Sequence, residues 1–147
     1  MSIETVVLTG ASGFIGGRVL ERLTGEVAEV RCLSRSPKDR LANLADGAVA
    51  FQADLSDRES LTEAFDGADV AFYLVHSLGE DGQLLEAELQ AARNFADAAA
   101  KAGVNRIVYL GALAQGPADE RSPHVASRNA VGQALRDTGV PVTEFRA

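Results

Sequence analysis

The chain has 147 residues, 46% hydrophobic and 24% charged, which is the composition of a folded domain with a single core and excludes a disordered or low-complexity chain. Its 14 basic and 21 acidic side chains give a net charge of −7, which disfavours binding to nucleic acid. Cys32 is the single cysteine, so no internal disulfide or cysteine-cluster metal site can form. The sequence shows no basic leader and no apolar run long enough to span a membrane, and it predicts a cytoplasmic protein.

Short apolar runs alternate with segments of helical periodicity along the whole chain, and glycine, proline or a capping residue separates them. The run Asp69–Val75 is nearly all apolar, as a parallel strand covered on both faces should be. The expected strands are Thr5–Leu8, Ala28–Leu33, Ala48–Phe51, Asp69–Val75, Arg106–Leu110 and Pro141–Arg146; the expected helices carry Ile15, Val19 and Leu23, begin at Pro37, follow a capping box at Ser56–Glu59, and span Gly82–Lys101 and Pro123–Asp137.

This alternation predicts one α/β domain over residues 1–147, a doubly wound Rossmann sheet of six parallel strands in the order 3-2-1-4-5-6. Ligands of such sheets bind at the carboxyl ends of the strands, where the first and fourth strands diverge. The loop Gly111–Pro123 is the longest irregular stretch, and we expect it at the same edge.

A glycine-rich turn joins the first predicted strand to the first predicted helix. Gly10 suits a tight turn, Gly13 lets the backbone approach a pyrophosphate, and Gly16 lets the helix pack closely on the strand. The helix N-terminus adds free N–H groups and a positive dipole end. The alternative is a plain turn, but the context favours a dinucleotide site formed by Thr9, Gly10, Ser12, Gly13, Phe14, Ile15 and Gly16.

Basic and hydroxyl residues follow the second predicted strand, where an NAD site usually carries an acidic residue for the ribose 2′-hydroxyl. Ser34 and Arg35 stand there instead, and a guanidinium can pair with a 2′-phosphate. The sequence therefore favours NADP(H) over NAD(H). A solvated arginine at a strand end is the alternative interpretation.

These features resemble the atypical short-chain dehydrogenase/reductase superfamily, of the NmrA-like and NAD(P)H-binding, epimerase-like type. The resemblance covers the whole chain and is carried by the glycine segment, Arg35, Ala53–Leu55, Tyr73–Gly79 and Pro141–Ala147. It implies that Asp54 binds the adenine amino group and that the main chain of Leu55 helps to hold the ring. Asp54 could instead be a turn residue, but Ser56 is expected to cap the following helix, which favours the cofactor role.

The residues directly after the fourth predicted strand, Val75, His76 and Ser77, lie where similar proteins pass the nicotinamide half of the cofactor. Two polar side chains that interrupt an apolar strand at the switch point favour contact with a ligand. A packing role is the alternative.

The family's catalytic residues are replaced in this chain. Active members carry a serine after the fifth strand and Tyr-x-x-x-Lys on the next helix, whereas this chain has Gly111 and Ala112, then His124 and Arg128. His124 is the candidate proton donor, with a surface or capping role as its alternative, and Arg128 is a candidate for ribose or phosphate binding. Two functions remain: an oxidoreductase acting on a small carbonyl- or quinone-type substrate, or a non-catalytic NADP(H) sensor or regulatory module.

Similar proteins continue past the position of Ala147 into a smaller lobe that covers the substrate, and this sequence does not include that lobe. It is a fragment, a truncated relative or a minimal cofactor-binding domain that needs a partner surface. The last two predicted helices carry alanine-rich faces, and small residues let helices of two subunits approach closely. They predict a homodimer through Ala92, Ala96, Ala99, Ala130 and Ala134.

Overall fold

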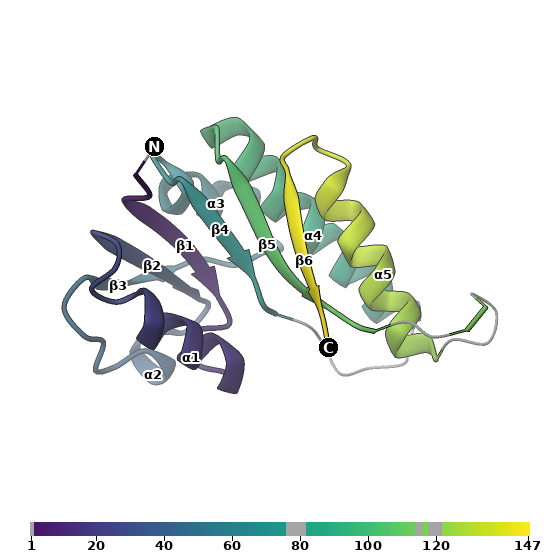
Figure 1. The fold of residues 1–147 in the computed structure, drawn as a ribbon, viewed down its shortest axis with the longest axis horizontal. Helices are drawn as coiled ribbons and strands as arrows, with labels where there is room; N and C mark the ends of the chain where they lie inside the picture. Colours follow the sequence, from purple (N-terminus) through teal and green to yellow (C-terminus); the bar gives the residue numbers. More distant parts are fainter. Residues whose placement is uncertain (1, 76–81, 114–115, 118–121) are drawn as a thin grey trace.

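The computed structural model describes residues 2–75, 82–113, 116–117 and 122–147, with residues 82 and 83 described by their backbone alone. Its described strands form one six-stranded parallel sheet in the order β3-β2-β1-β4-β5-β6, as the sequence predicts (Figure 1). The elements are β1 (Thr5–Thr9), α1 (Phe14–Leu23), β2 (Glu29–Ser34), α2 (Pro37–Arg40), β3 (Ala48–Gln52), α3 (Arg58–Phe65), β4 (Val70–Tyr73), α4 (Gly82–Ala102), β5 (Arg106–Gly111), α5 (Pro123–Arg136) and β6 (Val142–Arg146).

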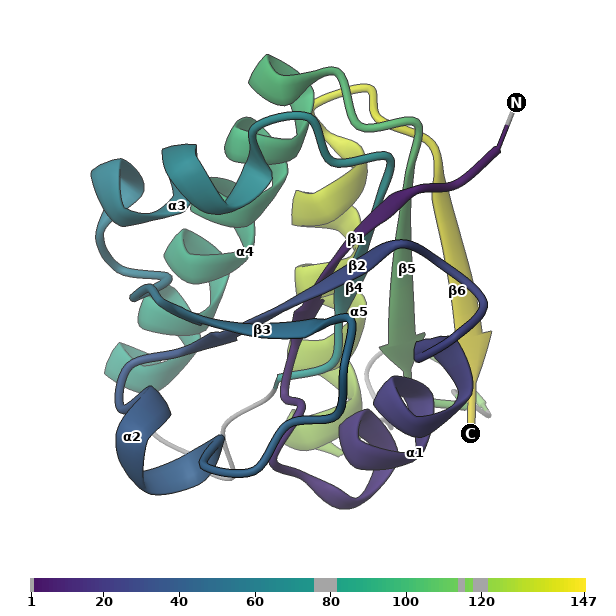
Figure 2. The same cartoon turned by 90° about the vertical axis from the view of Figure 1, so that its left-hand side faces the viewer.

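Helices cover both faces of the sheet, as Figure 2 shows with α1 on one side and α3 and α4 on the other. The larger core lies beneath α3, α4 and α5, where Phe65, Phe95 and Leu135 are fully buried. A smaller core lies beneath α1 around Leu8 and Cys32. Burial raises the pKa of the Cys32 thiol to about 11, so this cysteine is a packing residue.

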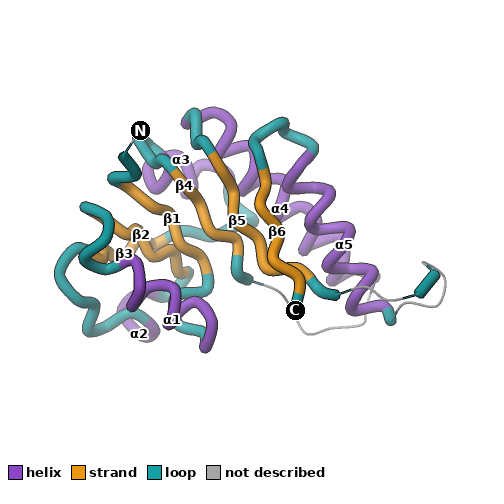
Figure 3. The backbone as a smooth tube through the Cα atoms, in the orientation of Figure 1, coloured by secondary structure: helices purple, strands orange, loops and turns teal. Residues whose placement is uncertain are grey.

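The strands run side by side and in the same direction, which brings their carboxyl ends to one edge (Figure 3). Thr9 pairs in register with Leu33 of β2, and Leu8 pairs with Phe72 of β4. Strand β4 is shorter than predicted: it ends at Tyr73, so Leu74 and Val75 leave the sheet. β1 and β4 therefore part at this edge.

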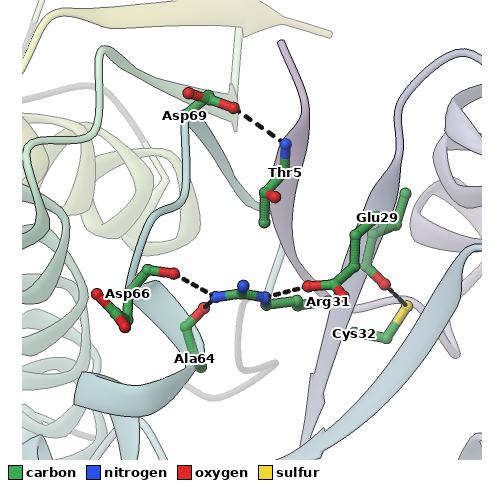
Figure 4. A network of polar contacts seen from close by, with 8 residues as sticks. Thr5, Glu29, Arg31, Cys32, Ala64, Asp66 and Asp69 are labelled. Carbon is green, nitrogen blue, oxygen red and sulfur yellow. Dashed lines mark hydrogen bonds and ion pairs between the residues drawn. The ribbon is translucent and has the colours of Figure 1, made fainter.

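The opposite, amino-terminal edge is fixed by the polar contacts of Figure 4. Arg31 of β2 donates to the carbonyl oxygens of Ala64 (3.0 Å) and Asp66 (2.6 Å), at the end of α3. The Asp69 carboxylate accepts from the main-chain N–H groups of Glu4 (2.8 Å) and Thr5 (3.0 Å), which joins the start of β4 to β1. These contacts anchor the end of the sheet that faces away from the ligand edge.

The alanine faces of α4 and α5 do not lie on the surface. Ala92, Ala96, Ala99 and Ala134 are buried in the larger core, and Ala130 is half-buried. The prediction that these residues form a subunit contact is wrong, because the same small side chains let α4 and α5 pack closely within the chain.

None of the described helices is both long and apolar enough to span a membrane.

Candidate functional site

A cleft with a volume of about 620 Å³ lies at the carboxyl edge of the sheet. The strands contribute residues at their carboxyl ends, and α4 and α5 form its far wall. The predicted site residues that line it are Thr9, Gly10, Ser12, Ser34, Arg35, Asp54, Leu55, Val75, His124 and Arg128. The structure thus brings together residues separated by more than a hundred positions. His76 and Ser77 lie outside the described residues.

The remaining predicted residues, at the start of α1, do not line the cleft with their side chains. Gly13 caps the helix, and its N–H donates to the Gly10 carbonyl at 3.0 Å. A Cβ at Gly16 would overlap the main chain of Gly10, so Gly16 permits the close approach of helix and turn. Phe14 and Ile15 point to solvent, Phe14 with 78% exposure. Any ligand contact in this turn of helix would use main-chain N–H groups.

The turn after β1 is shaped for an anion. Gly10 has φ +73°, and a Cβ there would lie 3.1 Å from the Leu74 carbonyl oxygen, so both conformation and space favour glycine. The N-cap of α1, Gly13, makes no side-chain capping bond, and the first turn carries no acidic residue. The positive end of the helix dipole is therefore not neutralised by the helix's own side chains.

Thr9 is buried and holds the point where β1 and β4 part. Its Oγ1 donates to the carbonyl oxygen of Phe72 at 2.9 Å and accepts from the N–H of Leu74 at 3.0 Å. The hydroxyl is thus engaged on both sides by β4. Thr9 positions the wall of the cleft rather than offering a free hydroxyl to a ligand.

Asp54 lies at the β3 end of the cleft in a tight turn. Its Oδ1 accepts from the N–H (2.9 Å) and the hydroxyl (2.8 Å) of Ser56. These two bonds hold the pKa of Asp54 below its ordinary value, and nearby Arg35 lowers it further, so the carboxylate is ionised at neutral pH.

The expectation that Ser56 caps α3 is wrong: Asp57 caps it by accepting from the Glu59 N–H at 3.1 Å. Asp54 therefore has a turn role in addition to any role toward a ligand.

Asn94 of α4 supports the same loop, and sequence reasoning missed it. This buried side chain donates from Nδ2 to the Leu55 carbonyl at 2.8 Å. Its Oδ1 accepts from Nε of Arg58 (2.8 Å) and Nε2 of Gln90 (2.9 Å). The available signal was an amide within the buried, alanine-rich stripe of a helix.

The other end of the cleft is formed by α4 and α5. His124 and Arg128 share a face of α5, as predicted, and both line the cleft. The Arg128 side chain holds a buried Nε that has no hydrogen-bond partner among the described residues. The Ser127 hydroxyl donates to Oε2 of Glu88 at 2.7 Å, which joins α5 to α4. A buried donor without a partner is rare in folded proteins, so this nitrogen is available to an acceptor in the cleft.

Two tyrosines form the floor beneath this end, and sequence reasoning treated both as strand residues. The Tyr109 hydroxyl donates to the Arg128 carbonyl at 2.9 Å, whereas Tyr73 has no hydrogen bond to a described residue. Burial raises the pKa of Tyr109 to about 12. Burial, with Tyr109 and Glu88 nearby, also raises the pKa of Tyr73 far above its ordinary value. Both phenols are therefore protonated at neutral pH.

The described residues contain no group of His, Cys, Asp and Glu suited to hold a metal ion.

Comparison with known proteins finds one family model and several named relatives. The model of the NmrA-like family matches residues 2–147. Quinone oxidoreductase 2 of Escherichia coli (strain K12) is 32% identical over 148 residues, covering 96% of this chain and 47% of that protein. The (4-alkanoyl-5-oxo-2,5-dihydrofuran-3-yl)methyl phosphate reductase of Streptomyces griseus subsp. griseus is 32% identical over 141 residues, covering 96% and 46%.

Solved structures give the same result. The triphenylmethane reductase of Citrobacter sp. superimposes with a TM-score of 0.78 at 27% identity, covering 97% of this chain and 48% of that one. An NADPH-dependent quinone oxidoreductase from Escherichia coli, complexed with NADPH, superimposes with a TM-score of 0.76 at 30% identity, covering 96% and 48%. The chain spans less than half the length of each of these relatives.

Proposed function

The chain belongs to the NmrA-like family, and from this membership and the cleft we propose that residues 1–147 form the NADP(H)-binding domain of an oxidoreductase. The observation that carries the proposal is the convergence, in one cleft, of the Gly10 turn, which leads into the N-terminus of α1, with Arg35 and Asp54. The cleft volume of about 620 Å³ lies within the range of small-molecule and cofactor sites.

The residues present fit a nicotinamide dinucleotide along the length of the cleft. The Gly10 turn and the N–H groups of α1 suit the pyrophosphate, and the ionised Asp54 carboxylate can accept from the adenine amino group. The buried Nε of Arg128, unpaired among the described residues, suits an oxygen of the other half. The reduced nicotinamide, when bound, supplies a hydride.

The preference for NADP(H) rests on the guanidinium groups of Arg35 and Arg40, which both line the β2 end of the cleft. Both side chains are exposed, and neither forms an ion pair with a carboxylate of the described residues. Two cations stabilise a 2′-phosphate but gain little from a 2′-hydroxyl. The structures of relatives with NADPH and NADP(H) are consistent with this preference.

The proposed reaction is hydride transfer to a small carbonyl- or quinone-type substrate. The four relatives described above are named as reductases or oxidoreductases, which favours this reaction over a sensor or regulatory module. Proton donation falls to His124, which is exposed at the cleft wall. The strand-5 serine of active family members has no equivalent at Gly111, where a Cβ would overlap the Glu144 carboxylate. The chain thus lacks a hydroxyl at this position to polarise a carbonyl.

Titration of the chain with NADPH and with NADH, followed by nicotinamide fluorescence and by calorimetry, tests the proposal. We expect NADPH to bind more tightly, and slow turnover with quinones and simple carbonyls. Binding of neither dinucleotide would overturn the assignment of the cleft, and equal affinities would overturn only the NADP(H) preference.

A homodimer and a cytoplasmic location stay predictions from the sequence. Because the alanine faces first assigned to the dimer are buried, a dimer would have to use other surfaces of the chain. Light scattering at micromolar concentration measures the state: the mass of a dimer supports the prediction, and 15.4 kDa contradicts it.

A further inference from the structure

Tyr73 presents a hydroxyl to the cleft from an otherwise buried side chain. It is the last residue of β4, is 3% exposed and lines the cleft. Its ring packs edge-on against Phe95, with centroids 4.9 Å apart, and Phe95 packs in the same way on Phe65 at 5.0 Å. The aromatic cluster therefore holds the phenol in one place.

The hydroxyl of Tyr73 has no hydrogen bond within the described part of the chain, in contrast to its neighbour on β5. Tyr73 and Tyr109 pair in register, and their ring centroids are 6.1 Å apart. The Tyr109 hydroxyl is satisfied by the Arg128 carbonyl at 2.9 Å. This hydroxyl opens on the cleft, where it is available to a ligand, and phenylalanine would pack the ring equally well. Packing alone thus explains the ring of Tyr73 but not its hydroxyl.

The surroundings of this hydroxyl define the group that fits there. The Arg128 Nε, which no described residue satisfies, is a second donor in the same wall. The Glu88 carboxylate raises the pKa of Tyr73 from nearby and accepts from Ser127 at 2.7 Å. Two donors beside a carboxylate suit a group that both accepts and donates hydrogen bonds, whereas a carboxylate ligand would face Glu88. A sugar hydroxyl meets these requirements.

The strand order decides which sugar this is. Arg35 and Asp54 follow β2 and β3, on one side of β1, and Tyr73 ends β4 on the other. A dinucleotide with its adenine half at Asp54 and its pyrophosphate at the Gly10 turn extends across β1 toward β4 and β5. Its second ribose then lies over Tyr73.

We propose that the Tyr73 hydroxyl is a cofactor-binding group that donates a hydrogen bond to the ribose of the nicotinamide half. The inference rests on the proposed dinucleotide function. The phenol keeps its proton across the neutral range, so it acts as a donor and not as a base.

The variant Tyr73→Phe tests the proposal, because it removes one oxygen and keeps the ring packing. Tyr109→Phe is the matched control, since it removes a hydroxyl that is bonded inside the protein. Each variant and the parent chain are titrated with NADPH and with 2′,5′-ADP, which carries only the adenine half. Urea unfolding without ligand gives the stability of each chain.

We expect Tyr73→Phe to weaken NADPH binding roughly five- to tenfold, to leave 2′,5′-ADP binding unchanged and to keep or raise the unfolding midpoint. We expect Tyr109→Phe to lower the unfolding midpoint. Unchanged NADPH affinity in Tyr73→Phe would overturn the inference, as would equal weakening of both ligands. A parent chain that binds neither ligand would instead overturn the proposed function, and the inference with it.

Discussion

Asn94 of α4 and Leu55 of the loop after β3 are joined by a 2.8 Å hydrogen bond from the Asn94 side chain to the Leu55 main chain. The bond fixes the loop that carries Asp54, and Arg58 and Gln90 hold the Asn94 amide in the orientation that the bond requires. Helix α4 therefore positions the Asp54 end of the cleft although Asn94 itself does not line the cleft.

Replacing the Asn94 side chain should lower both the stability of the chain and its affinity for NADPH. Asn94→Leu leaves the Leu55 carbonyl and Nε of Arg58 without their hydrogen-bond partner, so we expect a loss of roughly 1–3 kcal/mol in the free energy of unfolding. Gln90→Leu is the control, because it removes one bond from an exposed side chain and should change stability by less than about 0.5 kcal/mol. Urea unfolding and NADPH titration measure both effects; equal stability of the two variants would contradict the role of Asn94.

The variant Gly13→Val tests the proposal that the Gly10 turn and the start of α1 bind the pyrophosphate. Gly13 has φ −84°, and a Cβ there would lie 3.3 Å from the Gly10 carbonyl oxygen, so the fold accepts a side chain with a small shift. The added methyl groups would occupy the space at the helix end that the pyrophosphate needs, and NADPH binding should be lost. Gly17→Ala, one turn further along α1, should bind NADPH as the parent does. A folded Gly13→Val chain with parental affinity would show that phosphate binds elsewhere.

The cofactor preference should reverse in Arg35→Asp. A carboxylate in place of the guanidinium repels a 2′-phosphate and can accept from a 2′-hydroxyl, so NADPH affinity should fall roughly ten- to hundredfold while NADH affinity holds or rises. Arg22→Asp, at an exposed position in the last turn of α1, controls for the change in net charge. Equal losses in the two variants would indicate a general electrostatic effect rather than recognition at the cleft.

Substitutions at two positions of α5 should affect catalysis and cofactor binding separately. His124→Ala removes the proposed proton donor, and NADPH-dependent reduction should fall roughly 10²-fold with little change in NADPH affinity. Arg128→Ala removes the unpaired guanidinium nitrogen of the cleft wall, and its main effect should be weaker cofactor binding. Stopped-flow oxidation of NADPH and equilibrium titration give the two quantities. Turnover that is indifferent to His124 would assign the proton donor to another group.

Glu144 should make stability depend on acid pH. Burial alone would raise its pKa, but hydrogen bonds from Arg136 and Arg146 outweigh burial, and the pKa of the folded chain is lower than ordinary. The ionised pair therefore stabilises the fold above the ordinary carboxyl pKa, and this contribution is lost as the pH falls through the depressed value. The difference in unfolding free energy between parent and Glu144→Gln should be constant near pH 7 and shrink below about pH 4. Glu63→Gln, at an exposed position of α3, is the control for the loss of one carboxylate.

The sheet order and the place of the cleft follow from local patterns in the sequence. Apolar runs between glycine and proline predict parallel strands, and the right-handed crossover rule then orders them. Gly10 and Gly16 are recognisable because the chain itself requires the absence of a side chain at these positions. The positive φ of Gly10 and the approach of Gly16 to the Gly10 main chain depend on neighbours within a few residues.

The site residues that the sequence did not reveal depend on distant partners. Asn94 meets a carbonyl 39 positions away. The role that we propose for Tyr73 rests on a comparison with Tyr109, whose hydroxyl is bonded to the Arg128 carbonyl, while that of Tyr73 has no bond to a described residue. The alanines of α4 are equally suited to a subunit contact and to an internal one, and only the packing of α3 and α5 around α4 decides between them. Ser56 and Asp57 are both good helix caps, and the structure uses Ser56 for Asp54 instead.

The hydroxyl of Thr9 explains how a parallel sheet can open without losing cohesion. Where two strands separate, a carbonyl and an N–H normally lose their ladder partners and need water or a ligand. Thr9 supplies both missing partners from one side chain, accepting from Leu74 and donating to Phe72. The main-chain groups at the point where β1 and β4 separate are thus hydrogen-bonded without any ligand. A valine at position 9 has nearly the same shape as threonine but would leave both main-chain groups unpaired.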